Sequence, residues 1–143
     1  MQSIEDLIQA RVIFFQVFDV ASKLKTITET ARDHFGRKES LLFFVEDEKA
    51  LHFVDELLWK LPETSFLPHS TTDQKTTERI AITKTKSNVN NAHLAFNLCS
   101  TPLLLPGFKI IYDFEDLTAP NKKILSILRF NAYKQANRPL ESR

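Results

Sequence analysis

Residues 41–60 read LLFFVEDEKALHFVDELLWK, and this stretch decides the fold. Its first five residues, 41–45, form an unbroken apolar run, which is typical of a strand buried on both faces in a parallel sheet. The period then changes, because from Asp47 onward the apolar residues recur at the spacing of one helix face. A buried strand followed at once by an amphipathic helix predicts an α/β protein.

The helix that begins at Asp47 carries an unusual aromatic residue. On a helical wheel its apolar stripe contains Ala50, Val54, Leu57 and Leu58, flanked by Leu51 and Phe53. Trp59 falls about 160° from the middle of this stripe, on the charged side of the helix. Two interpretations stay open: Trp59 packs beneath a neighbouring segment, or it is kept for a protein partner.

The alternation of strands and helices continues on both sides of this stretch. Apolar and β-branched runs predict further strands over residues 11–18, 79–83, 93–99 and 108–114. Apolar residues at helical spacing predict further helices over residues 20–36 and 121–135. This order predicts a single α/β domain over residues 1–143, a sandwich with a mostly parallel sheet and helices on both faces.

The remaining segments are expected to be connectors. Residues 65–68 should be extended, because Pro68 fixes its own φ and disfavours helix in the residue before it. Residues 70–77 and 84–91 are polar and indicate surface loops. Residues 136–143 are expected to form a flexible tail.

Composition excludes several classes of protein. Nineteen basic residues against 18 acidic ones argue against a protein that mainly coats DNA phosphates. The single cysteine, Cys99, cannot form an internal disulfide, and no apolar run reaches the roughly 18 residues of a membrane span. The N-terminus does not resemble a signal peptide. We therefore expect a soluble cytoplasmic protein without a membrane contact.

Cofactor and metal sites are not expected. The two glycines, Gly36 and Gly107, lie 71 residues apart, whereas phosphate-binding loops need several glycines close together. None of the four histidines has the spacing to another ligand that a zinc site requires. The sequence thus predicts no cofactor, and it excludes the glycine-loop classes of nucleotide-binding enzyme.

One nucleophilic pair is conceivable. His93 and Cys99 are six residues apart on a predicted strand, which would place both on one face. No third residue is available to orient the histidine, and a lone cysteine more commonly acts as a small buried apolar residue. A hydrolase is therefore a remote alternative, and we expect no catalytic residues.

The last predicted helix has an unusual surface. Residues 121–143 contain six basic residues and one acidic residue, a local charge of +5. The wheel assigns Ile124, Leu125, Leu128 and Ala132 to the core, and it places Lys123, Ile127, Phe130 and Lys134 together on another row. Cations beside exposed apolar side chains suit an acidic peptide with a free carboxylate. Alternatively, basic residues with Phe130 and Tyr133 could form a stacking groove for single-stranded nucleic acid.

Three short motifs carry a resemblance to a known family. They are Asp47-Glu48-Lys49, then Asp55-Glu56-x-x-Trp59, then Pro62-x-x-Ser65-Phe66-x-Pro68-His69. In order and spacing the chain resembles the chi subunits of bacterial DNA polymerase III, more weakly from Val12 to Tyr133. The resemblance implies a Rossmann-like α/β fold without a cofactor loop, and it makes residues 1–10 a short N-terminal extension.

The resemblance also implies a function. Chi-like proteins are non-catalytic adaptors in the clamp-loader assembly of the replicative polymerase, and they reach DNA only through their partners. The match implies that Trp59, Phe66 and Pro68 bind the psi subunit, or a repair helicase that uses chi in the same role.

The resemblance assigns the last helix to the acidic C-terminal tail of single-stranded DNA-binding protein. Matching pocket positions are Lys123, Phe130 and Asn131; Arg129 and Tyr133 match the surrounding pattern, and Lys134 is a further cation nearby. Ile127 stands where the family has an arginine, and Asn131 replaces a basic residue. The two lost cations should together weaken a carboxylate clamp, by about 1–3 kcal/mol if each made a charged hydrogen bond. Arg129 or Lys134 could compensate by reaching across.

Overall fold

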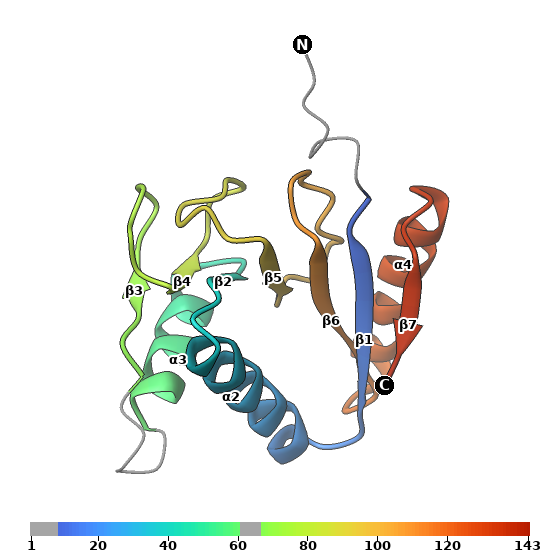
Figure 1. The fold of residues 1–143 in the computed structure, drawn as a ribbon. Coiled ribbons are helices and arrows are strands. Elements are labelled where there is room, and N and C mark those ends of the chain that lie inside the picture. Colours follow the sequence, from blue (N-terminus) through green and yellow to red (C-terminus); the bar gives the residue numbers. More distant parts are fainter. Residues whose placement is uncertain (1–8, 61–66) are drawn as a thin grey trace.

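The computed structural model describes residues 9–60 and 67–143. In chain order its elements are β1 (Arg11–Val17), α2 (Val20–Gly36), β2 (Leu41–Phe44), α3 (Glu48–Trp59), β3 (Ser70–Thr71), β4 (Ile80–Thr83), β5 (Leu94–Asn97), β6 (Ile110–Asp116), α4 (Pro120–Gln135) and β7 (Leu140–Ser142) (Figure 1). The predicted α/β class is confirmed, and every predicted helix and strand has a counterpart within a few residues of its expected ends.

The described strands form one seven-stranded sheet in the order β3-β4-β2-β5-β6-β1-β7. All of its pairings are parallel, so the mostly parallel sheet expected from the sequence is entirely parallel over these residues. Parallel neighbours need crossover connections, and helices α2, α3 and α4 supply three of them. The fold is thus a Rossmann-like sandwich.

Alternation along the strands divides the core into two layers. On β2, Leu41 and Phe43 pack in one apolar cluster, and Leu42 and Phe44 pack in the other. Helices α2 and α3 cover the first face, with Ile27, Ala31, Leu51, Val54 and Leu58 buried there. Helix α4 covers the second face, where Tyr133 joins the cluster, and Figure 1 shows it apart from α2 and α3.

Two aspartates fix the starts of the first two helices. The Asp19 carboxylate accepts a hydrogen bond from the Ser22 amide at 2.7 Å, and the Asp47 carboxylate accepts one from the Ala50 amide at 2.8 Å. Each satisfies an amide that the helix leaves without a partner. The motif residue Asp47 therefore has a structural role as the N-cap of α3.

The prediction for the core face of α4 is wrong. Ile124 and Leu128 are 60% and 58% exposed, whereas Ser126, Arg129 and Tyr133 face the sheet. The reason lies beneath the helix, on β6, where Asp113 is 1% exposed. A buried carboxylate needs hydrogen-bond donors, so the polar row of α4 turns inward and the apolar row turns out.

The predictions for two segments are also wrong. Within the expected flexible tail of residues 136–143, β7 pairs with β1, and the Val12 amide donates to the Pro139 carbonyl at 2.8 Å. Within the expected loop of residues 70–77, Ser70–Thr71 pairs with β4. Both are short strands at the sheet edges, held by main-chain bonds that a hydrophobic pattern does not reveal. None of the helices in the described ranges is long and apolar enough to cross a membrane.

Candidate functional site

Beneath α4 lies a buried polar network centred on Asp113. Its Oδ1 accepts hydrogen bonds from the Phe114 amide at 2.7 Å and from Arg129 Nε at 3.1 Å. Its Oδ2 accepts from the Tyr133 hydroxyl at 2.7 Å and from Asn97 Nδ2 at 3.1 Å. Burial raises the pKa of Asp113, and the opposing charge of Arg129 and these donors favour the ionised form.

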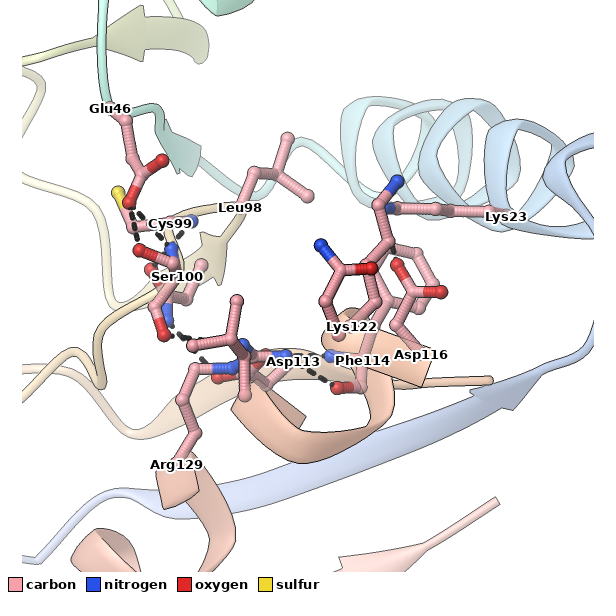
Figure 2. Close-up of a pocket in the computed structure, with 13 residues that line it drawn as sticks. Lys23, Glu46, Leu98, Cys99, Ser100, Asp113, Phe114, Asp116, Lys122 and Arg129 are labelled. Atoms are coloured by element: carbon pink, nitrogen blue, oxygen red, sulfur yellow. Dashed lines mark hydrogen bonds and ion pairs between the residues drawn. The ribbon is translucent and has the colours of Figure 1, made fainter. Parts of the chain in front are cut away.

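Arg129 uses its guanidinium entirely within the protein. It also donates to the carbonyls of Ser100 at 3.2 Å and Phe114 at 2.9 Å (Figure 2). Tyr133 is 0% exposed, and its hydroxyl accepts a hydrogen bond from the Leu103 amide at 2.9 Å. The assignment of Arg129 and Tyr133 to a partner-binding pocket is therefore corrected: both are interior residues. The stacking groove that requires Tyr133 fails for the same reason.

A surface groove runs along one side of α4, and we name it the α4 groove. Its volume is about 350 Å³. It lies between α4 and the β1–β7 edge of the sheet, lined by Phe14, Glu115, Leu117, Lys123, Ser126, Ile127, Phe130 and Ser142. The structure thus brings together three of the predicted tail-binding residues, Lys123, Ile127 and Phe130, in one concave surface.

The α4 groove has an apolar floor and one cation, Lys123, in its lining. Phe130 is half-buried and packs against Phe14, with ring centroids 5.5 Å apart. Ile127 is 51% exposed. Lys123 is exposed and forms no ion pair with any described residue. One acid, Glu115, lies on the opposite wall, where its carboxylate accepts a hydrogen bond from Gln16 Nε2 at 3.0 Å.

Two other predicted residues lie on α4 outside this groove. Asn131 and Lys134 are exposed, but neither lines the cavity. Five further residues line the groove and were not predicted from the sequence: Phe14, Glu115, Leu117, Ser126 and Ser142. Strand alternation could have placed Phe14 on the α4 face, whereas Ser142 reaches the groove only because the chain end forms β7.

A second candidate surface lies at the end of α3. Trp59 is 52% exposed, and its ring packs on His69 with centroids 4.9 Å apart. Pro68, which directly precedes His69, is half-buried. Phe66 lies outside the described residues. The interpretation that Trp59 packs against a neighbouring segment is confirmed for part of the ring, and its use for a protein partner stays a prediction.

His69 holds this surface together. Its Nδ1 lies 2.8 Å from the Leu67 carbonyl, and its Nε2 lies 2.7 Å from Asp55 Oδ1. The motif residues Asp55 and His69 therefore connect α3 to the segment after it, and they support the ring of Trp59.

A cleft at the carboxyl ends of the strands shows no catalytic arrangement. In Figure 2 the cleft is lined by residues that follow β2 and β5 and by residues of β6, with Lys23 from α2 and Lys122 from α4. Burial raises the pKa of the Cys99 thiol, which opposes activation as a nucleophile. His93 is exposed before β5 and Cys99 is buried after it, so they do not share a strand face. The described residues contain no group of three metal-ligating side chains.

Comparison with known proteins supplies a family. The model of the family described as DNA polymerase III chi subunit, HolC, matches residues 10–141 of the chain. No curated protein matches the sequence. The matched residues include Trp59, His69 and every residue that lines the α4 groove except Ser142.

Proposed function

Because the chain belongs to the family of DNA polymerase III chi subunits, which are accessory subunits of that complex, we propose that it is a non-catalytic adaptor of the clamp-loader assembly. In this role it links the psi subunit, or a repair helicase, to the acidic C-terminal tail of single-stranded DNA-binding protein. It works in the cytoplasm and reaches DNA through these partners.

The observation that carries the proposal is the composition of the α4 groove. An acidic tail that ends in an apolar residue presents a carboxylate next to an apolar side chain. Lys123 offers a cation without a competing ion pair among the described residues, and Ile127, Phe130 and Phe14 offer an apolar floor next to it. A charge-assisted hydrogen bond beside a hydrophobic contact is the arrangement that such a tail requires.

The family's missing cations restrict how the tail binds here. With Ile127 in place of an arginine and Arg129 committed to Asp113, the carboxylate depends on Lys123, with Lys134 the other exposed cation on α4. The apolar contact consequently contributes a larger share of the binding free energy. We expect weaker salt dependence than a clamp of several arginines would give.

The end of α3 is assigned to the polymerase partner. A partly exposed aromatic ring held in place by its neighbours is a typical anchor of a protein interface. Trp59 has this support from His69 and Asp55. Helices α3 and α4 lie on opposite faces of the sheet, so the two partners would not compete for space.

Calorimetry tests the tail site. A peptide copied from the tail of the cognate single-stranded DNA-binding protein should bind the wild-type protein, and Lys123→Ala combined with Phe130→Ala should abolish binding. The control is Lys122→Ala with Ile124→Ala, which likewise removes one lysine and one large apolar side chain from the same helix, outside the α4 groove. Unchanged affinity of the groove variant, or equal losses in both variants, would contradict this site.

A further inference from the structure

A second apolar groove lies between α2 and α3, and neither proposed partner occupies it. Its volume is about 570 Å³. Its apolar lining comes from both helices and from the residue after β5: Val20, Leu24, Ala50, Phe53 and Leu98. We name it the α2–α3 groove.

The α2–α3 groove exposes large apolar side chains to solvent, which is unfavourable. Val20 is 55% exposed and Phe53 is 54% exposed, although Leu51, Val54 and Leu58 of the same α3 helix are buried. Large apolar side chains gathered in a concave surface, rather than scattered singly, indicate a site that a partner covers. Buried Ile27, Val45 and Val54 form its base.

The charges around the α2–α3 groove favour an acidic occupant. Its acids are already engaged, because Asp47 caps α3 and Glu56 lies 3.6 Å from Lys60. Lys23 is likewise paired with Asp116, at 2.7 Å. By contrast, Lys49 of α3 and Lys122 of α4 are exposed, line the groove and form no ion pair with any described residue. The uncommitted charge is therefore positive.

The shape of the groove selects the conformation of the occupant. The edge strands of the described sheet are β3 and β7, and neither lines this groove. An extended peptide would therefore bury main-chain amides without a strand to pair with. A helix satisfies its own main-chain hydrogen bonds and can lay apolar side chains between two other helices.

We propose that the α2–α3 groove binds an acidic amphipathic helix of a protein partner. The apolar side chains of that helix pack against Val20, Leu24 and Phe53, and its carboxylates pair with Lys49 and Lys122. The groove adjoins the cleft of Figure 2, with which it shares Lys23, Leu98 and Lys122, and it includes neither Trp59 nor any residue of the α4 groove. This surface is therefore a third docking site, independent of the proposed function.

The test uses a designed helical peptide of about four turns, with leucines at positions i, i+3, i+4 and i+7 and glutamates elsewhere, labelled for fluorescence anisotropy. Two control peptides replace glutamate by lysine or scramble the order. Binding of the acidic helix only is expected. Phe53→Glu or Lys49→Glu should weaken binding at least tenfold, and both replace exposed side chains that the core does not need.

Trp59→Ala and Lys123→Ala should leave this binding unchanged, so failure of the α2–α3 groove is distinguished from failure of the proposed function. The proposal is overturned if the acidic helix does not bind, or if the lysine or scrambled peptide binds as well. It is also overturned if Phe53→Glu has no effect. Self-association of the protein, or capture of a poly-dT strand, that Phe53→Glu abolishes would assign the groove to a second copy or to nucleic acid instead.

Discussion

Asp113 illustrates how one buried charge determines the orientation of a whole helix. Its carboxylate is satisfied by Asn97, Arg129, Tyr133 and a main-chain amide. A buried ion pair adds little stability compared with apolar residues of the same shape, but loss of one partner leaves an isolated buried charge. The pair thus specifies which face of α4 meets the sheet.

Arg129→Met should destabilise the protein strongly, by about 3–5 kcal/mol, because Asp113 is left as an unpaired buried charge. The measurement is urea unfolding at neutral pH. Asp113→Leu combined with Arg129→Met should recover part of that loss. If Arg129→Met left the unfolding midpoint unchanged, Arg129 would be a surface contact and the interior assignment would be wrong.

The ion pair of Lys23 and Asp116 should make the stability of the fold depend on pH. Burial alone would raise the pKa of Asp116, but the hydrogen bonds from Lys23 at 2.7 Å and from Thr118 outweigh it, so the pKa lies below its usual value. The ionised form is therefore favoured by folding. Its contribution to stability is complete above the unfolded pKa of about 3.9 and is lost as the pH falls through the lower folded value.

Lys23→Met should consequently be less stable than the wild type at pH 7, and the difference in free energy of unfolding should shrink as the pH falls below about 4. Urea unfolding at a series of pH values measures both. A difference that stays constant down to pH 2 would mean that Lys23 stabilises the fold by packing and not by its charge.

At the scale of the element, helix and strand positions were predictable and the inward face of α4 was not. Periodicity located α2, α3 and α4 and the longer strands, because these elements repeat an apolar side chain at a fixed spacing. The apolar stripe of α4 faces solvent because the part of the sheet beneath that helix carries the buried Asp113. A helical wheel does not show what lies beneath a helix. The contribution of Ser142 to the α4 groove was likewise hidden, since β7 is a short edge strand that its hydrophobic pattern does not reveal.

Helix α4 lacks a side-chain cap at its N-terminus, and a substitution can supply one. Its N-cap residue is Ala119, which makes no side-chain hydrogen bond, and its start carries Lys122 and Lys123 close to the positive end of the helix dipole. Ala119→Asp should supply both a cap and a negative charge, and it should raise the free energy of unfolding by about 1 kcal/mol. Thermal unfolding measures the gain, with Ala119→Val as the control that adds volume without a cap. Equal stability of the two variants would contradict the assignment of Ala119 as an uncapped N-terminus.

At the scale of the whole molecule, the parallel sheet separates the two proposed partners. Helix α3 with Trp59 lies on one face, and α4 with its groove lies on the other. In the proposed role, the binding of one partner would raise the effective concentration of the other. Such an adaptor needs no reactive centre, only two surfaces that can be filled at the same time.

Sequential capture on a biosensor tests this bridging most directly. The tail peptide of single-stranded DNA-binding protein is immobilised, the protein is captured on it, and the psi subunit or clamp-loader complex of the same organism is then added. The account predicts a second increase in bound mass, lost in Trp59→Ala without loss of the first step, whereas Lys123→Ala with Phe130→Ala removes the first step. Displacement of the captured protein by the added partner, or tight binding of the purified protein alone to poly-dT, would contradict it.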